Sequence, residues 1–173
     1  MNYQFLDSPI GALRLVSDGM HLIGIEFEGQ YADDGSTERR DAVLALCAHQ
    51  LSDYFTGARH HFELPLAAQG TMFQQSVWDV LAKIPYGEVR SYRDVANAIG
   101  KPTAVRAVGA ANGRNPLPIV VPCHRVIGSN GALTGFAGGL PAKTFLLKLE
   151  GALSESEDIF DQSSKTAPSK VKH

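Results

Sequence analysis

The sequence contains little cysteine and no long apolar stretch. Only two of its 173 residues are cysteines, Cys47 and Cys123, which argues against a disulfide framework in a chain without a secretory signal pattern. No apolar run is long enough to span a bilayer. We therefore expect a cytosolic protein that does not enter a membrane and in which at least one thiol is kept reduced.

The sequence also has little net charge, although its charges are unevenly distributed. The net charge is −2, but residues 1–70 carry ten acidic and four basic side chains, whereas residues 71–152 carry four acidic and nine basic ones. A basic region suits a polyanionic partner such as nucleic acid, so the second half is the part expected to meet one. A chance scatter of surface charge would give the same counts.

The first third of the chain has the pattern of a small α/β unit. Apolar residues alternate over residues 12–17 and again over residues 22–27, and the turn dipeptide Asp18-Gly19 between them predicts a hairpin. A third strand is expected near residues 62–66, before a weakly patterned linker over residues 67–70. These three strands complete the predicted sheet.

A helix is predicted between the hairpin and the third strand. Ser36 or Thr37 can cap its start, apolar residues recur at helical spacing, and Gly57 ends it. Cys47 lies within the apolar stripe of this helix. We interpret it as a core side chain rather than a catalytic one, since a buried thiol commonly packs as a small hydrophobe.

The second part of the chain is predicted to be mostly helical. Thr71 can cap a helix whose apolar stripe ends before Pro85. Ser91 and Asp94 form a capping box at the start of a second helix, which Gly100 closes. The sequence therefore predicts two short helices before residue 100.

The next helix, predicted over residues 102–112, combines two features of DNA-binding helices. Pro102 starts it after a turn of about three residues, a helix–turn–helix spacing that many DNA readers share. Its side chains are small apart from Arg106, so that it could approach the narrow minor groove. Short helical hairpins also occur in proteins that bind no nucleic acid, and a slim helix can instead pack against a neighbour. Arg106 favours DNA binding, because burying a lone guanidinium is costly.

A cysteine with a neighbouring base follows an apolar run. Residues 119–121 predict a buried strand, which Pro122 ends, so that Cys123 lies at its mouth. A thiol becomes a strong nucleophile only as a thiolate, and the nearest base is His124. Neighbouring residues of an extended segment point to opposite sides, so we expect a bridging water between these two side chains.

A carboxylate could complete this pair. Glu150 follows a helix predicted over residues 142–149 and is a candidate to orient the far ring nitrogen of His124. The three side chains would then form a relay that keeps Cys123 ionised. A cysteine next to a histidine is also often incidental, and such a relay could instead serve a cysteine hydrolase acting on an acyl substrate.

Five segments together form a specific pattern. They are Arg106–Asn112, Asn115-Pro116, Pro122–Val126, Gly138-Gly139 and Leu146–Gly151. This pattern resembles the O6-alkylguanine-DNA alkyltransferases, densely from residue 71 to residue 151 and more loosely before. The resemblance implies a ribonuclease-H-like α/β domain with its linker over residues 1–70, a mostly α domain with a winged-helix-like helix–turn–helix over residues 71–152, and a disordered tail over residues 153–173.

The resemblance implies a role for most of the motif residues. Cys123 would accept the alkyl group, irreversibly and once per molecule, from an O6-alkylguanine flipped out of the duplex. His124 and Glu150 would form the water-bridged relay that makes its thiolate. Arg106 would fill the gap left by the flipped base, and Tyr92 would crowd the target phosphate and later lend a proton to the guanine.

The remaining implied residues hold the DNA and the base. Asn115 would tie the recognition helix to the active-site turn, and Arg125 would be a structural neighbour of the cysteine. The other implied DNA contacts are Thr103, Ala104, Ala107 and Arg114. The implied guanine pocket consists of Tyr92, Val126, Phe136 and Ala137. Some relatives have a tyrosine in place of Phe136 and a serine in place of Ala137, which leaves the range of alkyl groups, and activity on O4-methylthymine, open.

The expected partner is double-stranded DNA with alkylated bases, bound through its minor groove by a monomer. Some members of the family hold a structural zinc, but here no cysteine precedes Cys47, none separates it from Cys123, and the histidines are scattered. We therefore expect no metal, and no cofactor either, because no glycine-rich phosphate loop precedes a helix. A protein that marks lesions without transferring anything is the second hypothesis, and such relatives lack the cysteine.

Overall fold

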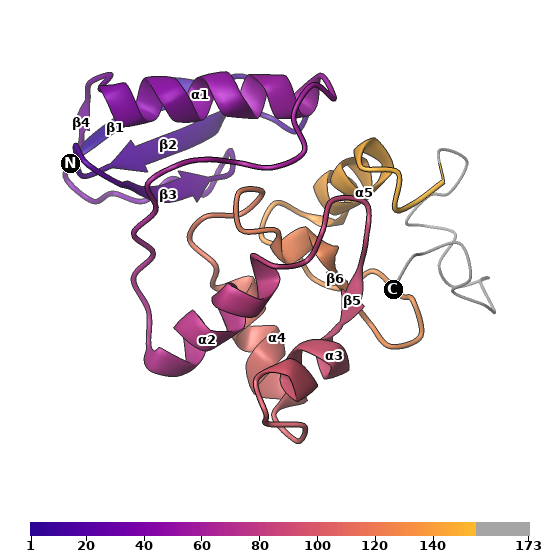
Figure 1. Cartoon of the computed structure of the whole chain (residues 1–173). Coiled ribbons are helices and arrows are strands. Elements are labelled where there is room, and N and C mark those ends of the chain that lie inside the picture. The colour runs from indigo at the N-terminus through magenta and orange to yellow at the C-terminus, as the bar shows by residue number, and fades with distance from the viewer. Residues whose placement is uncertain (155–173) are drawn as a thin grey trace. The chain divides into compact units, whose positions relative to one another are not determined.

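A computed structural model describes residues 1–154 of the chain, which form two compact units (Figure 1). The N-terminal unit comprises residues 1–69 and 116–120, and the C-terminal unit comprises residues 70–115 and the described residues from 121 to 154. Nearly all of the tail expected after residue 152 lies outside the described residues. Within residues 1–154, none of the helices combines the length and the apolar character needed to cross a membrane.

The N-terminal unit is a four-stranded sheet with a helix along one face (Figure 1). Its elements are β1 (Asn2–Leu6), β2 (Leu13–Ser17), β3 (Leu22–Glu26), β4 (Thr37–Glu38) and α1 (Ala42–Phe55). The strand order is β3-β2-β1-β4, and β4 is parallel to β1 while the other pairs are antiparallel. The predicted hairpin of β2 and β3 is confirmed, and β1 is an additional strand whose burial alternates only weakly.

The start of α1 differs from the prediction. Its N-cap is Asp41, whose carboxylate accepts a hydrogen bond from the backbone N–H of Leu44 (2.8 Å). Ser36 and Thr37 were the wrong candidates, because the chain at Thr37 is still extended and pairs with Asn2 of β1. A capping side chain acts only where the backbone turns into the helix.

The strand expected over residues 62–66 does not form. The Gln50 amide of α1 donates to Glu63 O (3.0 Å) and accepts from Glu63 N–H (2.9 Å). The backbone of this segment is therefore satisfied by a side chain instead of a neighbouring strand. Leu66 makes an isolated bridge with Leu22.

The C-terminal unit is mostly helical. Its elements are α2 (Met72–Leu81), β5 (Arg90–Ser91), α3 (Tyr92–Ala98), α4 (Val105–Gly113), the 3-10 turn η1 (Cys123–Arg125), β6 (Val126–Ile127) and α5 (Leu140–Leu149). The predicted caps are confirmed, since Thr71 with Gln74 and Ser91 with Asp94 each exchange reciprocal hydrogen bonds. Helices α2, α3 and α4 pack against one another, and β5 pairs in parallel with β6.

Helix α4 is shorter than predicted and is packed along one side. Residues 102–103 form a turn, so the helix starts at Val105. Val108 and Ala111 are buried, and the Trp78 indole N–H donates to Ala111 O (2.8 Å), whereas Arg106 is exposed. The small side chains thus serve close packing on one side while the other side stays accessible.

The strand expected over residues 119–121 is also wrong. Residues 119–120 form a turn, and the backbone of Ile119 has a φ of 74°, in the left-handed region that a β-branched residue rarely adopts. This loop belongs to the N-terminal unit, where Ile25 N–H donates to Pro116 O (2.9 Å). Cys123 therefore follows a tight loop and does not lie at the end of a strand.

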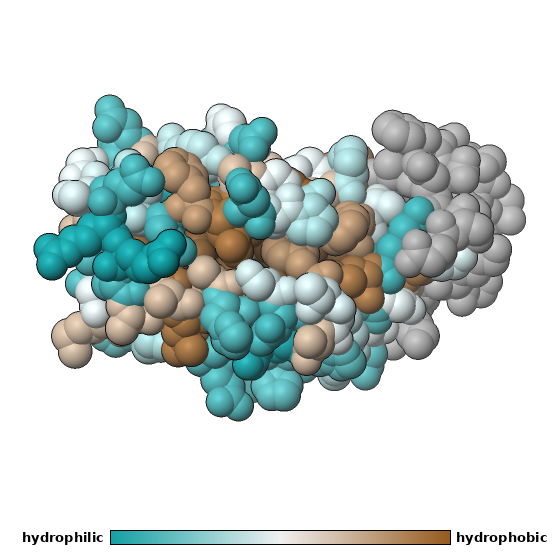
Figure 2. Space-filling model, turned by 90° about the horizontal axis from the view of Figure 1, so that it is seen from above, coloured by the Kyte–Doolittle hydropathy of each residue, from teal (hydrophilic) through white to brown (hydrophobic). Residues whose placement is uncertain are grey.

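Seven large apolar side chains are exposed among the described residues. The face in Figure 2 intersperses hydrophilic and hydrophobic residues. The exposed large apolar residues are Met1, Phe5, Met20, Tyr31, Leu46, Leu66 and Met72. Phe5 and Tyr31 pack edge to face, with 5.2 Å between their ring centres. Exposed apolar residues in such small numbers are normal on globular proteins.

Candidate active site

Cys123 is the first residue of the 3-10 turn η1 and is buried. Its own N–H donates to Val121 O (2.8 Å), and its carbonyl accepts the N–H of Val126. Pro122 precedes it and has no N–H of its own to satisfy. The backbone around the thiol is therefore held by local hydrogen bonds.

His124 and Glu150 are in direct contact, as the sequence suggested. His124 Nε2 lies 2.7 Å from Glu150 Oε2, and both side chains are fully buried. Burial raises the pKa of Glu150, but the hydrogen bonds from His124 and Arg125 and the charge of Arg125 outweigh this and hold it well below its usual range. The carboxylate is thus ionised and can only accept, so Nε2 carries the proton.

The other ring nitrogen of His124 faces no protein partner. Nδ1 is buried and has no hydrogen-bond partner among residues 1–154. Burial lowers the pKa of His124, although Glu150 opposes this. The imidazole is therefore neutral at pH 7, with Nδ1 as an available base one residue from Cys123.

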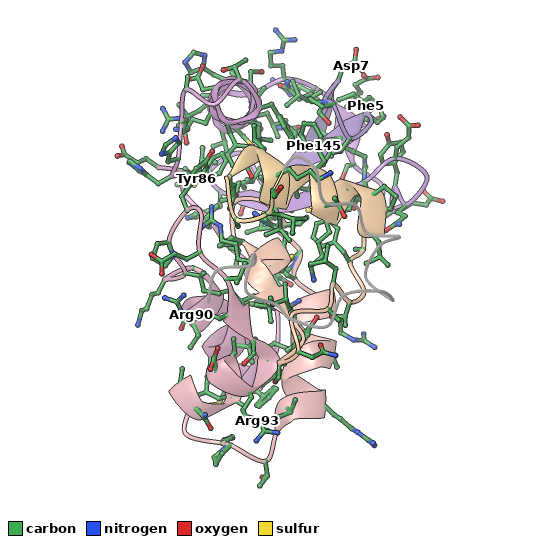
Figure 3. All side chains as sticks on the ribbon, turned by 90° about the vertical axis from the view of Figure 1, so that its right-hand side faces the viewer. Phe5, Asp7, Tyr86, Arg90, Arg93 and Phe145 are labelled. Atoms are coloured by element: carbon green, nitrogen blue, oxygen red, sulfur yellow. The ribbon has the colours of Figure 1, made fainter. Side chains whose placement is uncertain are left out.

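Arg125 clamps the carboxylate. Its Nε donates to Glu150 Oε1 (2.8 Å), one terminal nitrogen donates to Glu150 Oε2 (3.0 Å), and the other donates to Ile84 O (2.6 Å). The guanidinium also lies 5.7 Å from the ring centre of Tyr86. Tyr86, labelled in Figure 3, donates to Leu149 O at the end of α5 (3.3 Å). This network fixes Glu150, so Arg125 contributes to the orientation of His124.

Burial disfavours ionisation of the Cys123 thiol. Burial raises its pKa, and this outweighs the opposing effects of a hydrogen bond from Asn115 and the positive charge of Lys143. Burial therefore opposes the standing thiolate that the resemblance implied, because it disfavours the charged form. The proton of Cys123 has to leave when a substrate is in place.

Two asparagines flank the cysteine. Asn115 Nδ2 donates to Val121 O (2.8 Å), which ties the end of α4 to the loop before Cys123. Asn112, on α4, is buried and its Nδ2 donates to Cys123 O (3.3 Å). The resemblance implied that Asn115 ties the recognition helix to the active-site turn. It implied no role for Asn112, although Asn112 belongs to the motif Arg106–Asn112.

Lys143 is a buried cation that the sequence reading missed. Its Nζ donates to Val126 O (2.7 Å) and Thr134 O (3.0 Å). Burial lowers its pKa to about 8, while Cys123 opposes this shift. The available signal for a functional lysine was the place of Lys143 among the buried positions of α5, with Ala142 and Leu146. Unpaired lysines are rarely buried.

Tyr92 is the first residue of α3, and its hydroxyl lies 2.7 Å from Thr134 Oγ1. Burial raises its pKa, and a negative charge on Cys123 would raise it further. Val126 is buried, Phe136 is half-buried and Ala137 is exposed. The expected pocket residues thus lie on α3, on β6 and in the loop that Lys143 holds.

The expected DNA contacts lie on or beside α4. Thr103, Arg106, Ala107 and Arg114 are exposed, and Ala104 is half-buried. Arg93, labelled in Figure 3, is a further exposed cation on α3. Among residues 1–154, no group of three or more His, Cys, Asp or Glu side chains is arranged to hold a metal ion.

Known proteins match the chain along most of its length. A family model described as the DNA-binding domain of 6-O-methylguanine DNA methyltransferase matches residues 72–152, and one described as its ribonuclease-like domain matches residues 1–68. The methylated-DNA–protein-cysteine methyltransferase of Methanosarcina barkeri is 48% identical over 153 residues, which cover 87% of this chain and 97% of the relative. The chain belongs to this methyltransferase family.

Solved structures of methyltransferases of the family agree with the fold. The crystal structure of Mycobacterium tuberculosis OGT in complex with DNA superimposes with a TM-score of 0.82 at 45% identity, covering 87% of this chain and 92% of that one. The curated Mycobacterium tuberculosis methyltransferase is 43% identical over 164 residues, 93% of this chain and 99% of the relative. The resemblance inferred from the motifs is confirmed.

Proposed function

We propose that this protein repairs DNA by moving the alkyl group of O6-alkylguanine irreversibly to its own Cys123. Membership of the methyltransferase family supports the reaction, and the relative solved with DNA supports the partner. One observation carries the assignment of the site. Glu150 occupies Nε2 of a neutral His124, and Nδ1 of this residue, the next after the buried Cys123, has no hydrogen-bond partner among residues 1–154.

The reaction follows from the protonation states. His124 Nδ1 takes the thiol proton, directly or through a water, as the sulfur attacks the alkyl carbon. The bond between this carbon and the guanine O6 breaks, its electron pair goes to the guanine, and the proton of the Tyr92 hydroxyl neutralises the departing base. The product is a thioether that no group here can hydrolyse, so each molecule acts once.

A thiol that is protonated at rest suits a protein that acts once. The thiolate is the form that reacts with electrophiles and oxidants. A raised pKa of the thiol therefore protects Cys123 until a lesion arrives. Lys143 then stabilises the negative charge that develops on the sulfur. Burial thus protects the thiol, and the nearby cation Lys143 assists its activation.

We further propose that α3 and α4 act as a winged-helix-like helix–turn–helix on the minor groove. Its contacts would be Tyr92, Thr103, Ala104, Arg106, Ala107 and Arg114. The small exposed side chains around Arg106 support a close approach to DNA, and Arg106 would offset part of the stacking lost when the base flips. Asn115 would keep this surface in register with Cys123. The cytosolic location and the monomeric state stay predictions.

A single mass measurement tests the function. The intact protein is mixed with a duplex that contains one O6-methylguanine, and we expect a gain of one methylene mass per chain, located on the Cys123 peptide. Turnover should stop after one equivalent. Tight lesion binding without a mass gain would support a lesion-marking protein, and repeated turnover of an acyl substrate would support a hydrolase.

A further inference from the structure

Tyr92 has a side-chain partner that the reaction described above does not use. Its hydroxyl lies 2.7 Å from Oγ1 of Thr134, and either hydroxyl can be the donor. Thr134 is exposed, whereas Tyr92 is half-buried. A hydrogen bond between two hydroxyls at the surface adds little stability, because water offers the same bond. The contact is therefore better explained by what Thr134 does for Tyr92 than by the stability it adds.

The backbone brings the two hydroxyls together from neighbouring strands. Tyr92 follows β5 directly, and Ser91 of this strand pairs with Ile127 of β6. The chain then runs from β6 to Thr134, and Leu133 next to it is buried in an apolar cluster that includes Ile127. Both hydroxyls are thus positioned by the paired strands β5 and β6.

A buried cation fixes the backbone of Thr134. Nζ of Lys143, a residue without exposed surface, donates to Thr134 O (3.0 Å) and to Val126 O (2.7 Å). The carbonyl of Thr134 is therefore held by the interior, while its hydroxyl remains at the surface beside Tyr92. Binding and catalytic residues are often loop residues that a rigid scaffold positions in this way.

We propose that Thr134 is a positioning residue for the proton transfer from Tyr92, an inference that rests on the proposed function. When the bond between the alkyl carbon and the guanine O6 breaks, the Tyr92 proton moves to the departing base. The electron pair of the O–H bond stays on the tyrosine oxygen, and the Thr134 hydroxyl donates a hydrogen bond to it. Thr134 keeps its own proton, and water reprotonates the tyrosine after the base has left.

The surroundings of Tyr92 make this hydrogen bond useful. Burial raises the pKa of Tyr92, and a negative charge on Cys123 would raise it further, whereas the hydrogen bond with Thr134 lowers it. A tyrosine with a raised pKa is a weaker proton donor, so Thr134 acts in the direction that the reaction needs. Its effect grows once a bound base excludes water from the two hydroxyls, because a hydrogen bond is stronger in a low dielectric.

The test compares methyl transfer from the lesion duplex by Thr134→Val, Thr134→Ser and the wild-type protein under single-turnover conditions. Valine keeps the branched shape and removes the hydroxyl, so the rate should fall by about tenfold, as for one lost hydrogen bond to a developing charge. Serine keeps the hydroxyl and should recover most of the lost rate. A Thr134→Ser protein as slow as Thr134→Val would contradict the role of the hydroxyl.

Two further measurements distinguish proton transfer from a structural role. Tyr92→Phe has no hydroxyl proton to give, so adding Thr134→Val to it should slow methyl transfer no further. Alkylation of Cys123 by iodoacetamide releases iodide, which needs no proton, so Thr134→Val should react with this reagent at the wild-type rate. If valine slows transfer equally with and without the Tyr92 hydroxyl, or slows the iodoacetamide reaction by the same factor, the inference is wrong.

Thr56→Val is the matched control. Its hydroxyl is also exposed and makes a single described hydrogen bond, to Asp53 O (3.0 Å) at the end of α1. This variant should transfer the methyl group at the wild-type rate. If the wild-type protein takes no methyl group from the lesion duplex, the proposed function fails and this inference fails with it. If the wild type is methylated and Thr134→Val is methylated equally fast, the inference fails alone.

Discussion

The two cysteines of this chain are both buried, yet their surroundings differ completely. Cys47 lies among apolar side chains of α1, and burial alone raises its pKa to about 12. Burial also raises the pKa of Cys123, but there a hydrogen bond from Asn115 and the charge of Lys143 oppose it. Burial by itself makes a thiol inert, and the polar groups around Cys123 are what make its ionisation accessible.

The two buried arginines show a similar contrast. Arg14 pairs with Glu26 (2.8 Å) and Asp34 (3.0 Å), whose carboxylates are partly exposed. Arg125 pairs with a fully buried Glu150, which it shares with His124. The first cluster joins β2 to β3 and to the loop that carries Asp34, whereas the second leaves one nitrogen of His124 without a hydrogen-bond partner among residues 1–154. An ion pair becomes part of a reactive site when it prepares a neighbouring group.

Replacing each cysteine by alanine should give the largest difference in methyl transfer. Cys123→Ala should abolish methyl transfer while duplex binding persists, because no other thiol has a base beside it. Cys47→Ala should transfer a full equivalent and lose only about 1 kcal/mol of stability. Intact mass and a binding assay measure both. A methylated Cys123→Ala protein would show that the comparison of the two thiols is mistaken.

The base should have the next largest effect. His124→Gln should slow the single-turnover rate by about 10²–10⁴-fold, the usual contribution of a positioned general base. His49 is the matched control, since it also lies beside a carboxylate, Asp53 (3.4 Å), but is exposed and far from any reactive thiol in sequence. His49→Gln should leave the rate unchanged. Equal rates for both variants would remove His124 from the mechanism.

The carboxylate should mainly affect stability. Glu150→Gln leaves Arg125 buried without its anion and should cost about 3–5 kcal/mol of unfolding free energy at pH 7. Because the native pKa of Glu150 lies below its ordinary 4.5, its contribution is complete above that pH and is lost as the pH falls. The gap between wild type and variant in denaturant titrations should therefore narrow in acid. A constant gap from pH 7 to pH 3 would contradict the ionised pair.

The buried lysine should have the smallest effect of the four. Lys143→Met removes the cation near Cys123, so the pKa of this thiol should rise further and methyl transfer at pH 7 should slow by about tenfold, equivalent to about one pKa unit. The pH profile of Cys123 alkylation by iodoacetamide reports the shift. Lys148→Met on the same helix should leave the profile in place. A variant of Lys143 that is slower with an unshifted profile would indicate a structural role only.

Local signals in the sequence were reliable where the physics is local. The hairpin of β2 and β3, the caps Thr71 and Ser91, and the motif around Cys123 could all be read from neighbouring residues. The strands expected over residues 62–66 and 119–121 do not form, because their structure does not depend only on the pattern of apolar residues within them. The Gln50 side chain of α1 forms hydrogen bonds with the backbone of the first segment, and a turn at Ile119 interrupts the second. The apolar pattern of the two segments indicates neither feature.

The sequence by itself determined which residues can react and which family they belong to, because the motif places Cys123, His124 and Glu150 at specific positions. Only the tertiary structure decided their protonation states, since burial and hydrogen bonds between residues distant in the chain set the free energy of each charge. It also decided that Asn112 holds the backbone carbonyl of Cys123 and that the charge of a buried Lys143 acts on its thiol. A lysine and an asparagine look like surface residues until packing encloses them.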